Sequence, residues 1–142
     1  MRPKTGSDAV DAILYAAHRI RTATDGALRE HGLSLSGLKL LKALGEGDRS
    51  MRELSQVLHV SPRTVTDIID GLEGRGLVTR CAHPSDRRVT MIRRSEAGAA
   101  ETREAGIASE RVAAAAISGL DAAEQDTLCQ LLDRVGMPAL SR

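Results

Sequence analysis

Apolar positions recur at helical spacing along most of the chain. Between residues 8 and 30 they lie three or four residues apart, as expected for one face of a long helix, and His31-Gly32 ends the run. The same spacing returns over residues 35–44, 51–58, 62–74, 96–118 and 122–135. Polar residues occupy the opposite side of each segment, which is the pattern of amphipathic helices. The chain is therefore predicted to be mainly α-helical.

Capping residues mark where these helices begin. Ser50 and Glu53 have the spacing of a capping box, in which each side chain satisfies the other residue's backbone amide. Ser61-Pro62 predicts a helix with serine at the N-cap and proline at the first helical position. The remaining predicted N-caps are Ser34, Ser95 and Asp121. Glycine and proline, including Pro138 after the last segment, are expected to end the helices.

The periodicity changes between residues 78 and 93. Residues 78–81 and 89–93 are short runs rich in β-branched side chains, whereas residues 82–88 contain proline, serine and aspartate. We expect a β-hairpin with a long, basic tip. The fold class is thus mainly α with a small β-hairpin, in a single domain over residues 1–142.

Composition and charge refine this picture. Hydrophobic residues make up 42% of the 142 residues, but Tyr15 is the only aromatic, which favours packed helices over a large sheet. The net charge is only +1. Counted by segment, however, residues 49–94 carry a net charge of +4 and residues 95–142 carry −4. Because a local field steers a polyanion, the middle third is where we expect function.

Several classes of protein are excluded or disfavoured. No apolar stretch approaches the ~20 residues of a membrane span, and no long apolar segment follows the basic N-terminus. Two cysteines do not make a disulfide framework, so we expect a cytoplasmic protein with no membrane partner. No catalytic dyad or phosphate loop stands out, and the four histidines are scattered. We expect no enzyme activity, cofactor or metal; a zinc site would require residues distant in sequence to converge.

The segments 51–58 and 62–74 are joined by a tight turn, as in a helix-turn-helix. The second helix would bury Val65, Ile68, Ile69 and Leu72 and turn its other face, with Asp67 and Asp70, outward. Such a face fits the DNA major groove, and a helix start points its amide groups toward phosphate. The candidate DNA-binding residues on this helix are Ser61, Arg63, Thr64 and Thr66.

The hairpin predicts a second contact with DNA. Residues 77–94 contain five arginines and one acid, Asp86, which we expect to orient a neighbouring guanidinium. An arginine at the tip of such a wing can enter a narrow minor groove. Arg87 is the favoured candidate, with Arg88 beside it, whereas Arg93 and Arg94 could simply end the strand.

At these residues the sequence resembles the MarR family of bacterial winged helix-turn-helix transcriptional regulators. The resemblance runs from about residue 35 to 98, and its most specific part is Asp86-Arg87-Arg88 following Gly76-Leu77-Val78. It implies a homodimer on a pseudo-palindromic operator, often controlled by a small molecule or an oxidant. It also implies that Ser61, Arg63, Thr64 and Thr66 are recognition-helix positions and Arg87 the wing-tip arginine. Asp67 stands where the family often has a basic residue, and it could pair with Arg63.

Residues 34–94 are thus expected to form the DNA-binding part, and residues 8–31 and 95–140 a helical dimerisation part. The C-terminal third carries more apolar residues than a terminal helix pair should expose, which favours dimerisation over a merely acidic surface kept away from DNA. These residues are Ile117, Leu120, Leu128, Leu131, Leu132, Val135 and Leu140.

Three other residues are candidates for regulation. Tyr15 and His18 could bind a small-molecule effector in a cleft between the first helix and the DNA-binding part, although burial of Tyr15 in the core is the simpler interpretation. Cys81 on the wing is a candidate redox sensor, and Cys129 is expected in the core or an interface.

Taken together, the sequence predicts a DNA-binding transcriptional regulator that binds double-stranded DNA as a homodimer and responds to an effector. It would act at a promoter by occlusion, as a repressor, or by recruitment. The alternative is a winged-helix module that binds protein and not DNA, for which Asp67 and Asp70 would provide contacts. A small hydrolase or redox protein is a distant third.

Overall fold

The computed structural model describes residues 6–136, and these form six α-helices, two short 3₁₀ helices and three strands. The helices are α1 (Gly6–Leu28), α2 (Leu35–Ala43), α3 (Met51–Leu58), α4 (Pro62–Gly74), α5 (Glu96–Ala116) and α6 (Ala122–Asp133). The 3₁₀ helices η1 (Arg29–His31) and η2 (Leu44–Glu46) follow α1 and α2. The prediction of a mainly α fold with a small β-hairpin is confirmed.

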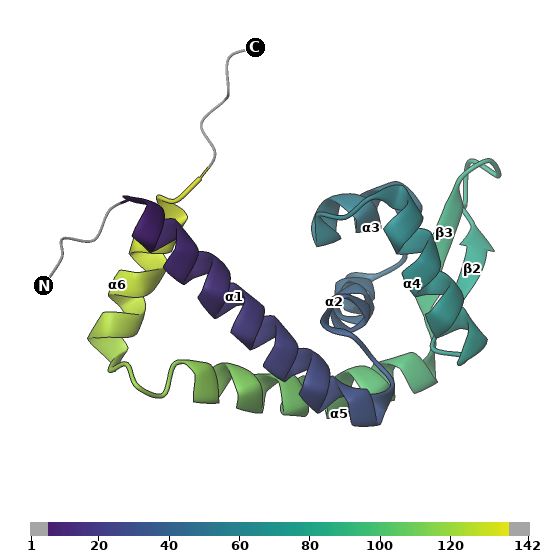
Figure 1. The fold of residues 1–142 in the computed structure, drawn as a ribbon. Helices are drawn as coiled ribbons and strands as arrows, with labels where there is room; N and C mark the ends of the chain where they lie inside the picture. Colours follow the sequence, from purple (N-terminus) through teal and green to yellow (C-terminus); the bar gives the residue numbers. More distant parts are fainter. Residues whose placement is uncertain (1–5, 137–142) are drawn as a thin grey trace, which may run out of the picture.

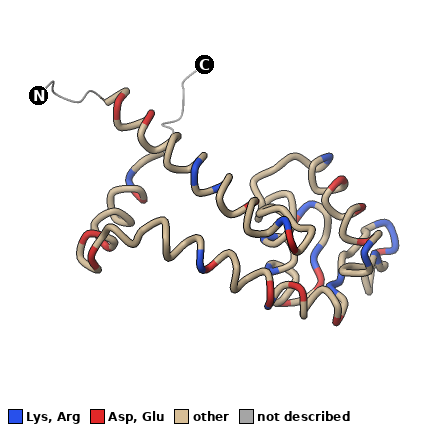
Figure 2. The backbone as a smooth tube through the Cα atoms, turned by 60° about the horizontal axis from the view of Figure 1, so that its bottom comes forward, with Lys and Arg blue, Asp and Glu red and all other residues tan. Residues whose placement is uncertain are grey.

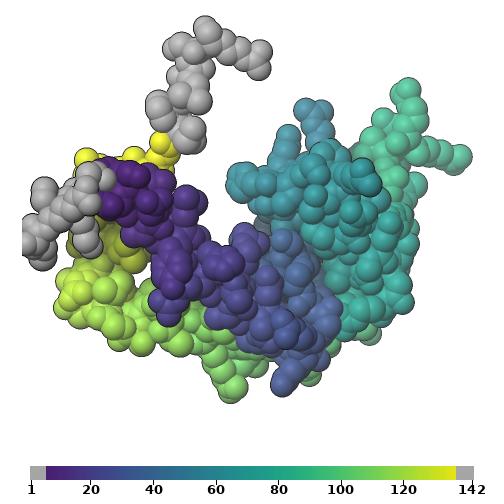
Figure 3. Space-filling view, in the orientation of Figure 1, coloured from purple at the N-terminus to yellow at the C-terminus, as the bar shows by residue number. Residues whose placement is uncertain are grey.

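The elements gather into two parts (Figure 1). Helices α1, α5 and α6 form the three sides of an open triangle, here called the helical part. Helices α2, α3 and α4 and the strands pack together against the N-terminal half of α5 and are here called the winged part. In the space-filling view these parts are two masses joined along one edge, with a broad notch between them (Figure 3). None of the helices within residues 6–136 has the length and apolar character required to cross a membrane.

The predicted hairpin is present, and it is part of a three-stranded sheet. Strand β2 (Val78–Ala82) pairs antiparallel with β3 (Thr90–Arg94), with Arg80 opposite Ile92. On the other edge of β3 lies β1 (Arg49–Ser50), with Arg49 opposite Ile92, so that the strand order is β1-β3-β2. The sequence analysis missed β1, a two-residue strand that leads directly into α3.

The hydrophobic core lies in the part that contains α2, α3, α4 and the sheet. Leu54 of α3, Val65 and Ile69 of α4 and Ile92 of β3 are fully buried there, together with leucines of α2. The buried hydrophobic residues range from Leu28, at the end of α1, to Ala105 on α5. Helix α6 has no buried residue.

Every predicted N-cap is confirmed. Ser34, Ser61, Ser95 and Asp121 each accept a hydrogen bond from the backbone N–H three residues on, and Ser50 and Glu53 form the full capping box. The helix ends differ slightly from prediction, because α1 gives way to η1 after Leu28 and α6 ends at Asp133. Pro138 and Leu140 lie outside the described residues.

The start of α5 packs closely against the turn between α4 and β2. The Ser95 backbone N–H donates to the carbonyl of Leu77 (3.0 Å), and the Ser95 hydroxyl donates to the carbonyl of Gly76 (2.6 Å). A Cβ atom added to Gly98 would lie only 2.1 Å from the Leu77 carbonyl oxygen. Only glycine permits this approach, which joins α5 to the winged part.

Candidate nucleic-acid interface

Helices α3 and α4 are joined by a tight turn that the chain closes with its own hydrogen bonds. The Ser55 hydroxyl donates to the carbonyl of Val60 (2.6 Å), and the Val60 N–H donates to the carbonyl of Ser55 (3.3 Å). His59 adopts the left-handed conformation at φ 53° and ends α3. Val60 packs against the core from this turn. These contacts fix the helix-turn-helix arrangement that the sequence predicts.

Helix α4 buries one face and exposes the other, as the spacing of its apolar residues predicts. Val65, Ile69 and Leu72 are buried and Ile68 is half-buried. Asp67 is exposed, and no ion pair within residues 6–136 joins it to Arg63.

The candidate residues at the start of α4 differ in how they are held. The hydroxyls of Ser61 and Thr64 lie 2.9 Å apart, and Ser61 also caps the helix. The Thr66 hydroxyl donates to the carbonyl of Pro62 (3.1 Å). Arg63 is exposed and has no hydrogen bond or ion pair to any described residue. The helix therefore presents three organised hydroxyl groups and one uncommitted guanidinium.

The tip of the wing is organised by two side chains. His83 Nδ1 accepts hydrogen bonds from the backbone N–H groups of Ser85 (3.1 Å) and Asp86 (3.2 Å). Asp86 Oδ1 in turn accepts from the Arg88 backbone N–H (3.1 Å) and lies 3.4 Å from its Nε. The prediction that Asp86 orients a guanidinium is confirmed for Arg88. The role of His83 was missed, because its partners are backbone groups of an irregular loop.

Arg87 extends from the same loop and is exposed. It makes no hydrogen bond or ion pair with the described part of the chain, whereas Arg88 is held at its backbone and Nε although its side chain is 93% exposed. In the tube view the tip of the wing is strongly basic, and acidic residues gather at the α5–α6 corner at the opposite end of the molecule (Figure 2). The basic wing tip and the acidic α5–α6 corner thus lie at opposite ends of the molecule, while other acidic residues of the C-terminal third lie on the half of α5 beside the sheet.

Arg80 joins the wing to the exposed face of α4. Its guanidinium donates to Asp70 (2.6 Å) and to Glu73 (2.5 Å), so that one arginine of β2 binds two carboxylates of the helix. The hydrogen bond to Asp70, with the charge of Glu73, raises the pKa of Arg80 above its ordinary value. Asp70 lies on the exposed face of α4, as the spacing predicts, but its carboxylate is paired with Arg80.

Two further wing arginines are also bound within the protein. Arg93 forms an ion pair with Asp48 (2.7 Å), and its hydrogen bond lowers the pKa of the Asp48 carboxyl below its usual range. Arg94 donates to the carbonyl of Leu41 (3.1 Å). Three of the five arginines counted in the hairpin therefore bind groups outside it, whereas Arg88 contacts only Asp86 within the wing tip and Arg87 has no partner among residues 6–136.

The helical part exposes a large amount of apolar surface. Val10, Leu14 and Tyr15 on α1 and Leu131 on α6 are each more than half exposed. Tyr15, at 64% exposure, does not lie in the core, and the guanidinium of Arg19 lies 5.7 Å from the centre of its ring. The interpretation of Tyr15 as a core residue is wrong for the single chain, because no element of the described chain covers that face of α1.

His18 lines a cavity of about 690 Å³ between α1 and α5. Thr22 and Ala23 of α1 and Val112 and Ala115 of α5 also line it, and Tyr15 does not. This cavity lies between two helices of the helical part. Of the two candidate effector-binding residues, only His18 therefore lines this cavity.

The two cysteines lie in different parts of the molecule, and both are free thiols. Cys81 is half-buried in β2, opposite Met91 of β3. Cys129 is exposed on α6. Of the two positions expected for it, in the core or in an interface, the core position is therefore wrong.

The chain matches the model of the MarR family over residues 33–90, from two residues before α2 to the start of β3. Two relatives from Bacillus subtilis (strain 168) are HTH-type transcriptional regulators. The chain is 29% identical to the uncharacterized regulator YdgJ over 105 residues, which are 73% of this chain and 64% of YdgJ. It is 27% identical to MhqR over 129 residues, 89% of each chain. The match to YdgJ thus covers less than two thirds of that relative's length.

Solved structures resemble the whole fold. A probable transcriptional regulator from Pseudomonas aeruginosa is 29% identical, with a TM-score of 0.82 over 90% of this chain and 97% of the other. Bordetella bronchiseptica BpsR, whose DNA binding is regulated by 6-hydroxynicotinic acid, is 24% identical, with a TM-score of 0.83 over 94% and 96%. The helix-turn-helix, the wing and the flanking helices described above agree with these matches, and the chain is similar to the MarR family over residues 33–90.

Proposed function

We propose that this chain is a sequence-specific DNA-binding transcriptional regulator. The observation that carries the proposal is the selective pairing of charge on the winged part. Arg80, Arg93 and Arg94 are bound within the protein, whereas Arg63 on α4 and Arg87 on the wing have no partner among residues 6–136. Unpaired arginines on a helix face and a wing tip are suited to phosphates and base edges. MarR-family regulators are generally DNA-binding proteins without enzymatic activity.

In the proposed complex, α4 enters the major groove. Ser61, Thr64 and Thr66 offer hydroxyl groups at its N-terminal turns, and Arg63 offers a guanidinium. Arg87 reaches the adjacent minor groove, where a narrow groove strengthens the negative potential, and Arg88 contacts the backbone. Residues 34–94 act as the DNA-binding part within one single-domain chain.

The functional unit that we propose is a homodimer. The apolar side chains exposed on α1 and α6 form a surface larger than single scattered residues, which marks an interaction site. Pairing two copies through residues 8–31 and 95–140 covers this surface, of which residues 137–140 lie outside the described range. A two-fold dimer places two α4 helices ~34 Å apart and so reads a pseudo-palindromic operator.

An effector is the third element of the proposal. BpsR, with the same fold, has its DNA binding regulated by a small acid. The cavity lined by His18 lies between α1 and α5, which connect the helical part to the winged part. A ligand that favours one spacing of the two α4 helices changes operator affinity by population shift. Occlusion of a promoter by the DNA-bound state makes the protein a repressor.

The test begins with selection of bound DNA from a random pool. On the selected operator, Arg87→Ala is expected to weaken binding by ~1–3 kcal/mol and to reduce the salt slope by about one, because one phosphate-region contact is lost. Fluorescence anisotropy over a series of salt concentrations measures both values. Arg111→Ala, at an exposed position near the C-terminal end of α5, is the matched control and is expected to change neither.

Two outcomes would contradict the proposal. Equal salt slopes for Arg87→Ala and the parent protein would remove the wing from the DNA contact. A complete lack of salt-sensitive retention of DNA would favour a winged-helix module that binds protein.

A further inference from the structure

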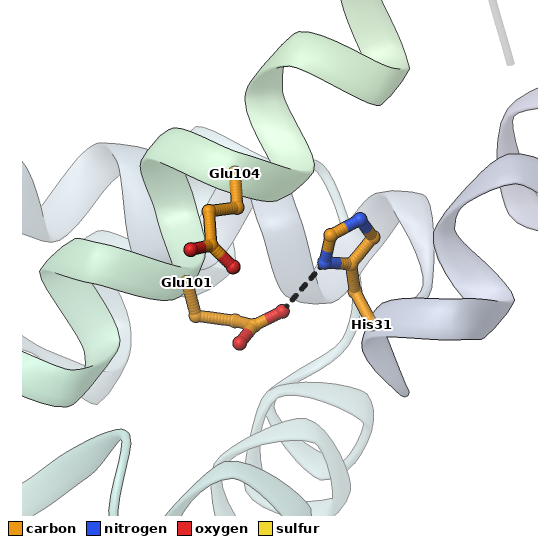
Figure 4. Close-up of side chains that lie close together, drawn as sticks. All are labelled: His31, Glu101 and Glu104. Atoms are coloured by element: carbon orange, nitrogen blue, oxygen red, sulfur yellow. Dashed lines mark hydrogen bonds and ion pairs between the residues drawn. The ribbon is translucent and has the colours of Figure 1, made fainter.

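Three metal-ligating side chains meet where η1 packs beside α5. His31 is the last residue of η1, and Glu101 and Glu104 lie one turn apart on α5. One potential ligand atom from each residue lies within 4.8 Å of the others (Figure 4). His31 and Glu101 are 70 residues apart, so no local spacing predicts the cluster, and the expectation of scattered histidines missed it.

The cluster contains more negative charge than its internal contacts satisfy. His31 Nδ1 lies 2.8 Å from Glu101 Oε1, and both side chains are about four-fifths buried. The Glu104 carboxylate is directed to the same point but binds none of the described residues (Figure 4). No Lys or Arg within residues 6–136 forms an ion pair with either glutamate. Two carboxylates this close repel each other unless a cation lies between them.

The dimensions suit a transition-metal ion. Zn²⁺ binds imidazole nitrogen and carboxylate oxygen at roughly 2.0–2.2 Å, and tetrahedral geometry then separates two donor atoms by about 3.4 Å. The separations in the cluster extend from 2.8 Å to at most 4.8 Å and so bracket this value. Rotation of the exposed Glu104 side chain and a slight widening of the His31–Glu101 contact would bring the three atoms to the required spacing.

We propose that His31, Glu101 and Glu104 form a binding site for a divalent transition-metal ion such as Zn²⁺. One imidazole and two carboxylates are a donor set for such ions, whereas Mg²⁺ and Ca²⁺ prefer oxygen ligands alone. Without an ion, their hydrogen bond holds His31 and Glu101 beside each other. Binding of the ion replaces this hydrogen bond and releases its proton to solvent, and Glu104 completes the site. Three protein ligands leave one position for water or another ligand.

The position of the site connects it to the recognition helix. Gly32, directly after His31, adopts a left-handed conformation, and its carbonyl accepts a hydrogen bond from Arg75 Nη1 (3.0 Å). Arg75 is the C-cap residue of α4. An ion that holds His31 against α5 therefore fixes the segment to which the end of α4 is bound. Binding of the ion to the folded state alone also stabilises the protein.

The test is a titration of tag-free, metal-free protein with Zn²⁺ by isothermal calorimetry, with thermal unfolding in parallel. We expect one Zn²⁺ per chain and a rise in the unfolding temperature. Glu104→Gln should weaken Zn²⁺ binding at least about 10-fold, since loss of even an outer-shell partner has that effect. Because Glu104 is exposed and has no partner in residues 6–136, this variant is expected to fold normally.

Glu110→Gln, on the same helix and outside the cluster, is the matched control and should bind Zn²⁺ as the parent does. His31→Gln should lose binding in the same way as Glu104→Gln. Unchanged Zn²⁺ affinity in Glu104→Gln, or no saturable binding in the parent, would overturn the proposal. Equal binding of Mg²⁺ would overturn the choice of a transition metal. None of these measurements involves DNA, so they are independent of the proposed function.

Discussion

The two parts of the molecule differ in how completely they satisfy their own side chains. The winged part encloses a core of fully buried residues, including Leu54, Val65 and Ile69, and pairs most of its arginines internally. Of the helical part, α6 buries nothing, and Leu14 and Tyr15 of α1 are more than 60% exposed. The winged part is thus complete as a single chain. The helical part carries apolar side chains typical of a core, but on α1 and α6 many of them are not covered by any described residue of the same chain.

This difference explains why apolar residues at the same helical spacing are buried in the winged part and exposed on α1 and α6. Burial of apolar area is the main stabilising term, so exposed leucines on α6 contribute little to the stability of one chain. They become stabilising when a second copy covers them. The comparison predicts that the same substitution acts on folding in one part and on assembly in the other.

The largest expected effect comes from placing a carboxylate at one leucine in each part. Leu54→Asp should unfold the chain, because an unpaired buried charge costs more than about 4 kcal/mol of a total of ~5–15 kcal/mol. Leu131→Asp should leave the chain folded, because its side chain is 52% exposed, but should raise the dimer dissociation constant at least about 100-fold. Circular dichroism and sedimentation velocity measure folding and assembly separately.

The control for assembly is Val57→Asp on α3, where an apolar side chain of the winged part is 48% exposed. It should remain a folded dimer. A folded Leu54→Asp, or a Leu131→Asp that is as dimeric as the parent, would contradict the division into a self-sufficient and a dependent part.

A smaller effect is expected from two glycine substitutions. Gly98→Ala should cost ~1–3 kcal/mol of the free energy of unfolding, because its Cβ meets the Leu77 carbonyl oxygen where α5 joins the winged part. Gly26→Ala, in α1, meets nothing within 4 Å in the single chain and should add ~0.4–1 kcal/mol. Urea unfolding measures the free energy of unfolding of both variants. If Gly98→Ala were stabilised as Gly26→Ala is, the close contact between residue 98 and the Leu77 carbonyl would not destabilise the fold.

The smallest effect concerns the pH dependence of the winged part. The hydrogen bond from Arg93 lowers the pKa of Asp48 below its ordinary value of 3.8, so the ionised form is favoured in the folded state. The pair therefore stabilises the fold above pH ~4, and this contribution is lost as the pH falls through the folded-state pKa. Asp48→Asn should be slightly less stable than the parent at neutral pH, and the difference should disappear in acid. Thermal unfolding between pH 7 and pH 3 tests this, and a difference that grows in acid would refute the assignment.

The local features of the fold could be predicted because they depend on neighbouring residues. A serine three residues before its partner amide caps a helix whatever the tertiary structure, and so Ser50, Ser61 and Ser95 were all identified. The hairpin followed from a change of period over a short segment. By contrast, β1 is a strand only because β3 lies beside it, and nothing in Arg49-Ser50 indicates this.

The features that escaped prediction depend on contacts between distant residues. Arg80 was counted with the other wing arginines, but Asp70 and Glu73 bind it across the turn between α4 and β2. The cluster of His31 with Glu101 forms only when η1 packs against α5. Tyr15 was expected in a core that one chain does not possess. The roles of Arg63 and Arg87 in DNA binding remain predictions, although their lack of partners in residues 6–136 agrees with them.

The hydrogen bonds of Arg80 have a consequence for the DNA complex proposed above. Because the guanidinium of Arg80 binds two carboxylates of α4, it holds this helix and the wing at a constant distance from each other. Within each half-site, the number of base pairs between the major-groove and minor-groove contacts is then invariant. A change between the DNA-bound and the released state of the dimer would therefore alter the distance between its two α4 helices. DNA in which the distance between the two half-sites is changed should therefore distinguish the two states of the dimer. DNA in which the sequence within a half-site is changed should not.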